Sequence, residues 1–349
     1  MRLDVRVPAW ATHYISDHTD MDRRPQRVSA ERVPRFTLNL PDDVRFEYAF
    51  VDGGGRVRAD PERGATGSNP WYPEVTEVRG PGYEPHTLAD PPAPAAPWPV
   101  TRHRIASRAF GETRRFAVAS PPEVHGPLPV VVLHDGVAYQ RLARTADVLA
   151  ELNRRGHACP VHLVFVEPGD RRREYAWDER HIRFVHDEVR PLVADQHRTG
   201  AGWWAMGASL GGLAAATLAL HAPDDWSGVI AQAGAFLGSP HDRRHHGVEH
   251  SWLAERLEAG AGAHLRWVLE VGTLDWLLAV NRRVRDALDG FGVDLHYRER
   301  PVGHNWGGWR DALPEVLAAA LDPHAEGGCL QRLSGVGDEA RAMPVAAAR

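Results

Sequence analysis

A serine flanked by glycines constrains this chain more than any other feature, since Gly207-Ala208-Ser209-Leu210-Gly211 has the form G-x-S-x-G. An apolar run of strand type, residues 202–206, precedes it, and a strong helix former, residues 213–220, follows it. A strand, a sharp turn and a helix form the context in which this pattern exposes a serine hydroxyl. The glycines have a steric purpose, because such a turn brings strand and helix too close for side chains. The alternative is an ordinary turn with a capping serine, since the pattern alone is common.

Strand-like and helical runs alternate on both sides of this turn, from residue 101 to residue 323, which predicts an α/β domain with a largely parallel sheet. The run 128–133 is continuously apolar, as expected of a strand buried on both faces. Further strands are expected at 113–118, 161–166, 202–206, 229–233, 265–271 and 293–299, and helices at 138–155, 179–195, 213–220, 251–259, 276–289 and 307–321.

The first 88 residues have a different pattern, with short alternating runs broken by turn residues. Residues 44–51 alternate as a strand does, and Asp52-Gly53-Gly54-Gly55 directly after them is a hairpin signal. We therefore expect a small antiparallel β-sandwich over 1–88. A Pro/Ala-rich stretch, 89–100, reads as a stiff linker to the α/β domain, and 324–349 as a flexible tail.

The composition and net charge of the chain limit the kinds of partner that it can bind. Apolar residues make up 43% and charged residues 25%, which suits a globular protein with a large core. The net charge of −5 argues against nucleic acid as the main partner. The first residues, Met1–Arg6, show no apolar stretch of a signal peptide, and no later segment is apolar enough to span a bilayer. We expect a cytoplasmic protein that has no membrane partner.

A serine hydroxyl is a weak nucleophile until a base takes its proton, so the turn predicts a histidine that is oriented by a carboxylate. In this type of fold the chain order is serine, acid, histidine, each at the carboxyl end of a strand. There are 20 histidines, so position must decide between them. His304 lies directly after the predicted strand 293–299 and before the last helix, which makes it the candidate base. Its alternative role is that of a loop or helix-cap residue.

The candidate acid is Asp275, which follows the predicted strand 265–271. The same position suits an N-cap of the helix expected from Trp276 onward, and both roles fit the sequence. Asp294 and Glu270 are weaker candidates, because they lie inside or beside strands rather than in the loop that follows one.

The tetrahedral intermediate of ester cleavage needs preorganised donors for its oxyanion, and two backbone N–H groups suffice. One should come from Leu210, directly after the serine. The other should come from the loop after the strand 128–133, from Gly136 or Val137, and the sequence leaves open which. The alternative is that this loop is only an Asp-Gly turn.

Several segments occur in the order and spacing of a known family: Val132–Gly136, Arg171–Tyr175, Gly207–Gly212, Asp275 with Asn281, and Gly303–Arg310. In them the chain resembles the esterase family of α/β-hydrolases, which includes enterochelin esterases, S-formylglutathione hydrolases, feruloyl esterases and mycolyltransferases. The N-terminal part is similar to that of the enterochelin esterases, which carry an immunoglobulin-like sandwich. Phe46-Glu47-Tyr48, Asp52-Gly53 and Asp60-Pro61 stand in the matching places.

The resemblance implies that Ser209, Asp275 and His304 are nucleophile, acid and base. The family often has Asp after the histidine, where this chain has Asn305. It implies a small-molecule ester substrate, with a siderophore trilactone as the specific guess, and no cofactor. A general carboxylesterase, a carbohydrate-ester or feruloyl-type esterase, and a catalytically silent binding protein of the same fold remain alternatives, and a homodimer remains open.

Four residues are candidates for substrate contact. Arg171, Arg173 and Glu174 belong to a charged stretch that we expect to be a loop at a strand end, the side where ligands bind in such sheets. Arginine suits an anionic ferric catecholate, although a solvated charged loop explains the stretch equally well. Trp306 is placed to wall a pocket together with Trp309, or to anchor the core.

The histidines at 245, 246 and 250 are spaced in a way that permits metal binding. A polar loop explains them better, and we expect no metal.

Overall fold

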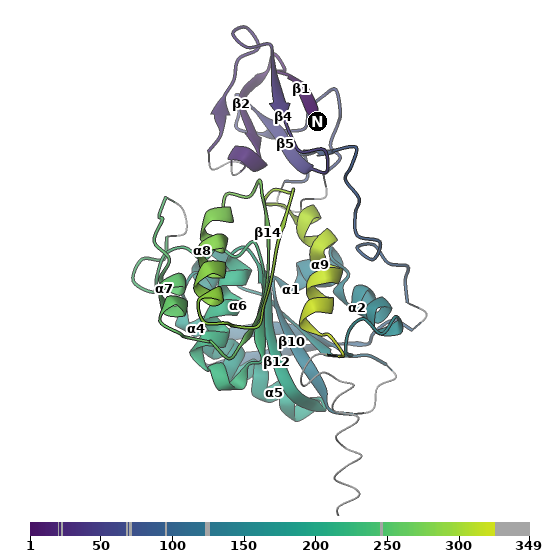
Figure 1. The fold of residues 1–349 in the computed structure, drawn as a ribbon, viewed down its shortest axis with the longest axis vertical. Coiled ribbons are helices and arrows are strands. Elements are labelled where there is room, and N and C mark those ends of the chain that lie inside the picture. Colours follow the sequence, from purple (N-terminus) through teal and green to yellow (C-terminus); the bar gives the residue numbers. More distant parts are fainter. Residues whose placement is uncertain are drawn as a thin grey trace, which may run out of the picture.

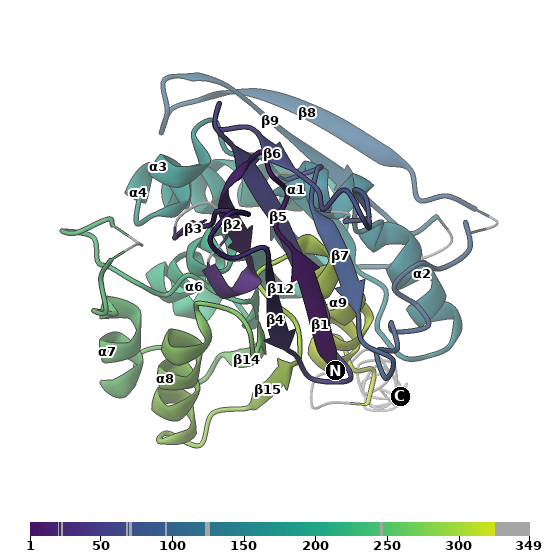
Figure 2. The same cartoon turned by 90° about the horizontal axis from the view of Figure 1, so that it is seen from above.

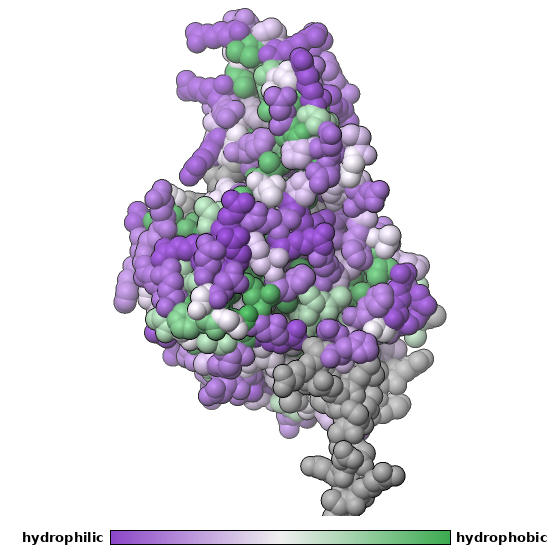
Figure 3. Space-filling model, viewed as in Figure 1, coloured by the Kyte–Doolittle hydropathy of each residue, from purple (hydrophilic) through white to green (hydrophobic). Residues whose placement is uncertain are grey.

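The computed structural model describes residues 1–19, 21, 24–67, 69, 72–94, 96–122, 126–244 and 247–324. A narrow group of N-terminal strands stands on one end of a broader α/β body (Figure 1). Hydrophilic residues cover most of the face seen in Figure 3, on both parts. Among the described residues, no helix is long and apolar enough to cross a bilayer.

Eight strands of the described chain form the sheet of the larger body, in the order β15-β14-β13-β12-β10-β11-β9-β8. The strands from β15 to β11 run parallel, and β9 and β8 pair antiparallel at one edge. The predicted α/β body with a largely parallel sheet is therefore confirmed. The bounds are β8 Val100–Ser107, β9 Glu112–Ala119, β10 Leu128–His134, β11 His162–Val166, β12 Thr199–Ala208, β13 Gly228–Gln232, β14 Arg266–Gly272 and β15 Leu295–Arg300.

Helices cover both faces of this sheet (Figures 1 and 2). Helices α1, α2 and α9 bury one face, and α4 to α8 bury the other. The alternation of β10 shows why: Val131 and Leu133 belong to the first core, and Val130 and Val132 to the second. The helix bounds are α1 Gly136–Arg141, α2 Thr145–Arg154, α3 Arg171–Tyr175, α4 Glu179–Arg183, α5 Arg190–Gln196, α6 Leu210–His221, α7 Trp252–Glu258, α8 Leu278–Asp289 and α9 Trp306–Ala320; a π-helical turn, Phe184–Val189, joins α4 to α5.

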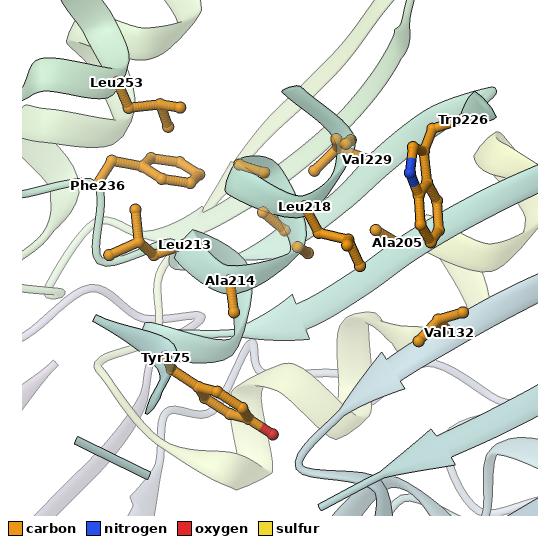
Figure 4. Packing of buried hydrophobic residues seen from close by; sticks show 14 of the residues in the cluster. Val132, Tyr175, Ala205, Leu213, Ala214, Leu218, Trp226, Val229, Phe236 and Leu253 are labelled. Carbon is orange, nitrogen blue, oxygen red and sulfur yellow. The ribbon is translucent and has the colours of Figure 1, made fainter. Parts of the chain in front are cut away.

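Helix α6, which follows the G-x-S-x-G turn, is buried along nearly its whole length. Leu213, Ala214 and Leu218 pack between the sheet and surrounding side chains such as Phe236 and Tyr175 (Figure 4). A helix that is apolar on all sides has no face for solvent, so it belongs in the centre of a domain. The turn before it is therefore held by core packing on several sides.

Two predictions of local structure were wrong. The single helix expected over 138–155 is two helices, because Arg144 takes a left-handed conformation with φ 50°. A straight helix of this length would extend about 27 Å, whereas the bend lets Tyr139 and Leu149 reach the same core. The stretch from Arg171 is helix α3 and not a loop, and Asp170 caps it by accepting a hydrogen bond from the Arg173 amide at 3.2 Å.

Strand β8 was not predicted, because its charged residues hide the pattern of an edge strand. It begins at Val100, the last residue of the expected linker. The expected linker packs against the larger body, since Trp98, like Leu88 just before the linker, is buried in the core beside α9. The carbonyl of Ala89 accepts a hydrogen bond from the Arg310 side chain at 3.2 Å.

The N-terminal strands form two antiparallel sheets in the described chain: β1 pairs with β4, and β3-β2-β5-β6 form the second sheet with β7 also paired to β5. Apolar residues of both sheets share one core. The hairpin predicted at residues 52–55 is confirmed, since it joins β5 to β6. The bounds are β1 Arg2–Arg6, β2 Ala11–Ser16, β3 Gln26–Arg27, β4 Arg35–Asn39, β5 Arg45–Asp52, β6 Val57–Arg58 and β7 Thr76–Arg79.

Candidate active site

The G-x-S-x-G segment forms the expected sharp turn between β12 and α6. Ser209 has φ 56° and ψ −122°, a backbone conformation that residues other than glycine rarely adopt and that costs about 1–3 kcal/mol. A Cβ on Gly207 would lie 2.3 Å from the carbonyl oxygen of Gly211, so the close approach demands glycine. The Ser209 amide donates to the carbonyl of Gln232 on β13 at 2.9 Å. The steric role predicted for the flanking glycine is confirmed.

Ser209, His304 and Asp275 meet at the carboxyl ends of β12, β15 and β14. The His304 Nε2 lies 3.0 Å from the Ser209 Oγ, and its Nδ1 lies 2.8 Å from an oxygen of Asp275. Ser209 and Asp275 are buried, and His304 is partly exposed. With Nδ1–H donating to the carboxylate, Nε2 is free to accept the serine proton. The three residues that the sequence singled out are thus brought within hydrogen-bond distance.

Asp275 fills both roles that its position suggested. One oxygen accepts the hydrogen bond from His304, and the other accepts from the Leu277 amide at 2.9 Å, just before α8. The weaker candidates lie elsewhere. Asp294 is exposed and pairs with Arg266 at the opposite end of the sheet, before β15 begins. Glu270 is buried on β14, and this burial raises the pKa of its carboxyl to about 7.

Of the predicted oxyanion donors, Leu210 is the first residue of α6, where a helix has no internal partner for its N–H. The loop after β10 turns sharply, because Asp135 has φ 59°. In this loop the Val137 amide donates to the carboxylate of Glu167. That contact leaves Gly136 as the better candidate for the second donor.

Arg171 lies against the turn and makes an ion pair with Asp135. Its guanidinium contacts both carboxylate oxygens at 2.7–3.0 Å and donates to the carbonyl of Ala208 at 3.3 Å. Asp135 in turn lies 3.2 Å from where a Cβ on Gly211 would stand. The Asp135 partner was not foreseen, because only the tertiary structure brings strand ends from distant segments together.

The other predicted substrate contacts differ in their surroundings. Arg173 is exposed on α3. Glu174 is buried and forms a two-pronged ion pair with Arg114 of β9, at 2.7 and 3.1 Å. Trp306 is only 3% exposed and packs edge-on against Tyr139 at 5.1 Å. The positions of Glu174 and Trp306 fit packing roles, whereas Arg173 is available to a ligand.

Two of the hollows on the described surface lie in different places. One of about 430 Å³ adjoins the turn and is lined by Val137, Arg141, Glu167 and Arg171, among others. A larger one of about 1210 Å³ lies on the N-terminal sheets beside Gln26–Val33, and neither hollow is lined by any of the three converging residues. The smaller hollow is the nearer to the turn, because Arg171, which lines it, donates to the carbonyl of Ala208.

The structure describes only part of the histidine group considered for metal binding. His245 and His246 lie outside the described residues, and His250 pairs with Glu255 at 3.1 Å. No group of three or more ligand side chains with metal-binding geometry occurs in the part of the chain that is described.

Comparison with known proteins gives consistent results. The family model described as "Putative esterase" matches residues 107–320. The chain is 26% identical to the Iron(III) enterobactin esterase of Escherichia coli K12 over 311 residues, which cover 85% of this chain and 75% of that protein. It is 25% identical to an Iron(III) salmochelin esterase of Escherichia coli O6:H1, over 58% of this chain and 53% of that protein.

Among solved structures, the enterochelin esterase of Shigella flexneri is similar with a TM-score of 0.70 at 23% identity, and the match covers 92% of each chain. A ferulic acid esterase matches with a TM-score of 0.54 at 19% identity, over 64% of this chain and 97% of that one. At these identities the likeness to the solved structures concerns the fold. The family match, which spans more than half of the chain, and the sequence relatives show that the protein belongs to this esterase family and is a carboxylic ester hydrolase.

Proposed function

We propose that the protein is a serine esterase in which Ser209, His304 and Asp275 form the catalytic triad, and that its substrate is a siderophore trilactone of the enterobactin type. The observation that carries the first part is the pair of contacts made by His304, 3.0 Å to Ser209 and 2.8 Å to Asp275. The names of the relatives, iron(III) enterobactin and salmochelin esterases, support the second part.

In this mechanism the Ser209 Oγ attacks the ester carbonyl carbon while His304 Nε2 takes the serine proton. Asp275 accepts the Nδ1–H hydrogen bond throughout, which fixes the tautomer and stabilises the imidazolium. The tetrahedral intermediate then collapses, and His304 returns the proton to the departing alcohol. A water molecule repeats the sequence on the acyl-enzyme and releases the acid.

The oxyanion needs two donors, and the Leu210 amide at the start of α6 suits the first. We assign the second to Gly136, because the neighbouring Val137 amide is bonded to Glu167. The helix dipole of α6 adds a favourable field for negative charge at the same end.

For the substrate, a ferric catecholate is anionic, and exposed arginine suits it. Arg172 and Arg173 are exposed on α3, and Arg171, the first residue of the same helix, reaches the turn. We further propose that residues 1–88 form an immunoglobulin-like module, that 89–100 link it to the catalytic domain 101–323, and that 324–349 form a tail, nearly all of it outside the described residues. A cytoplasmic location and a homodimer stay predictions.

The decisive experiment compares wild type with Ser209→Ala on two substrates, ferric enterobactin and a small p-nitrophenyl acyl ester. We expect wild type to release linear trimer and smaller catecholate products, and Ser209→Ala to lose about 10⁴-fold or more of kcat on both substrates. A fluorophosphonate probe should label wild type and not the variant.

Turnover of the small ester without opening of the trilactone would reject the siderophore part and favour a general or feruloyl-type esterase, which a methyl ferulate assay then tests. Full activity of Ser209→Ala would reject the triad. A wild type that neither turns over any ester nor reacts with the probe would reject both.

A further inference from the structure

The N-terminal sheets contact the two loops that carry the acid and the base. Leu274, the residue before Asp275, packs against the apolar core of those sheets. The amide of Arg45, the first residue of β5, donates to the carbonyl of Pro301 at 3.0 Å, and Arg45 bridges to Val302 in a parallel sense. Strands β1, β4 and β5 accordingly lie across the end of the larger body when it is seen from above (Figure 2).

A buried side-chain contact lies directly beside the base. Asn305 follows His304, and its Nδ2 donates to a carboxylate oxygen of Asp17 at 3.2 Å, while its Oδ1 accepts from the Gly308 amide at 2.7 Å. Because an amide N–H must meet an oxygen, the cap at Gly308 fixes which end of the Asn305 side chain faces Asp17. Both side chains are almost fully buried.

The residue before the base also lies against Asp17. A Cβ on Gly303 would be 2.0 Å from the Asp17 Cγ and 2.3 Å from its Cβ. The same oxygen of Asp17 that meets Asn305 accepts a hydrogen bond from the Glu47 amide of β5 at 2.7 Å. His304 therefore lies between two residues that both contact one side chain, Asp17, in the 3-10 turn directly after β2.

A second contact holds the start of α9. The guanidinium of Arg45 donates to the carbonyl of Gly307 at 2.9 Å and pairs with Asp311 at 2.9 Å and with Glu77 of β7. A Cβ on Gly307 would lie 2.1 Å from this guanidinium. The helix that follows His304 is thus attached to the N-terminal sheets by a buried cation.

From these contacts we infer that Asp17 is a positioning residue, which holds the loop of His304 through Asn305 so that the base reaches both Ser209 and Asp275. The inference rests on the proposed triad. Its physical basis is that catalytic side chains must be held within about 0.5 Å of their productive positions. A loop outside the main sheet needs contacts with its neighbours to be held that accurately. The acid–base half of the site is complete only when the N-terminal sheets are docked.

Three variants of the full-length chain separate positioning from simple attachment. Asp17→Ala removes the acceptor, whereas Asp17→Asn keeps an oxygen for both donors. Asn305→Asp keeps the helix cap and replaces the donor that faces Asp17 with an acceptor. Asp4→Ala, at an exposed carboxylate of the same sheets that accepts from Thr37, is the control. For each we measure kcat and KM on the p-nitrophenyl ester, and the melting temperature.

We expect kcat to fall about 10–100-fold in Asp17→Ala and in Asn305→Asp with KM changed by less than about threefold, because a misplaced base slows chemistry more than binding. Asp17→Asn should restore kcat to within about threefold of wild type, and Asp4→Ala should match wild type. In the double variant of Asp17→Ala and Asn305→Asp, the two losses should not multiply, since both remove one contact.

Wild-type kcat in both Asp17→Ala and Asn305→Asp, measured well below their melting temperatures, would overturn the inference and leave the triad intact if Ser209→Ala is inactive in the same assay. Multiplied losses in the double variant would overturn it as well. If Asp17→Ala does not fold, Asn305→Asp and Asp17→Asn decide the question.

Discussion

The two halves of the proposed triad are held in different ways. Ser209 takes its position from its own sheet: the close approach of Gly207 to Gly211, the carbonyl of Gln232 and the buried helix α6 fix it. His304 and Asp275 lie on loops that also contact the N-terminal sheets, through Asn305 and Leu274. The proposed nucleophile is thus positioned by residues close to it in sequence, whereas the segment of the proposed base contacts a residue 288 positions away.

The two halves are therefore stabilised by different kinds of interaction. The turn of the serine stores backbone strain, and a dense core around it maintains that strain. The loops of the acid and the base carry polar groups that a core cannot hold by packing alone, so hydrogen bonds and a buried cation hold them instead. Substitutions that disturb the N-terminal sheets should therefore displace the loops of Asp275 and His304 before they affect the turn of Ser209.

The largest effect should come from the acid itself. Asp275→Asn should lower kcat about 10³–10⁴-fold without loss of folding, because the imidazole loses the partner that fixes its tautomer. Asp294→Asn, at the other end of the sheet, is the matched control and should keep wild-type kcat in the p-nitrophenyl ester assay. A large loss of kcat in Asp294→Asn together with wild-type kcat in Asp275→Asn would instead identify Asp294 as the acid.

The next effect concerns the attachment of the acid–base side. Arg45→Met should reduce the free energy of unfolding by about 3–5 kcal/mol, because it leaves Asp311 buried without its cation and removes one of the two cations that pair with Glu77. Arg282→Met removes an exposed ion pair with Glu299 and should leave stability unchanged within error. Guanidinium unfolding monitored by tryptophan fluorescence measures both, and equal losses would show that burial of the pair does not matter.

A substitution in the serine half should act through packing. Gly207→Ala should cost about 2–3 kcal/mol of stability, since its Cβ would overlap the backbone of Gly211. Gly126→Ala is the control, because a Cβ there meets no atom within 4 Å. Thermal unfolding of the two variants tests this prediction, which fails if they melt at the same temperature.

The smallest effect is a pH dependence at the interface of the two parts. Burial raises the pKa of Glu47 to about 7 from an ordinary value of 4.5, and burial also raises the pKa of Asp17, with the charges of Glu47 and Asp275 acting in the same direction. Between pH 4.5 and about 7 the folded chain keeps a proton on Glu47 that the unfolded chain releases. The contribution of Glu47 to the free energy of unfolding is therefore fully present below pH 4.5 and is lost as the pH rises through about 7.

Glu47→Gln imitates the protonated side chain and keeps an acceptor for the Asn69 amide. Relative to wild type, it should gain about 1–2 kcal/mol between those pH values. Glu62→Gln, at an exposed glutamate of the same part of the chain, should follow wild type. Urea unfolding at a series of pH values measures the difference, and identical curves for Glu47→Gln and wild type would contradict the prediction.

Much of the fold could be predicted from the sequence, because the patterns that indicate it are local. The apolar run of β10, the alternation of strands and helices and the hairpin at 52–55 each follow from a few neighbouring residues. The errors arose where the core overrides local preference. Arg144 breaks a helix so that two shorter ones reach one core, and β8 carries charges because it is an edge strand.

For the site, the sequence by itself determined which residues we propose as the triad: a serine on a sharp turn, with Asp275 and His304 following in the required order after strands. Only the tertiary structure decided that one carboxylate accepts hydrogen bonds from both His304 and the Leu277 amide, that Arg171 pairs with Asp135, and that Asp17 and Arg45 contact the segment that follows His304. The physical reason is that a turn is encoded by the sterics of adjacent residues, whereas a buried polar contact needs partners that only folding brings together.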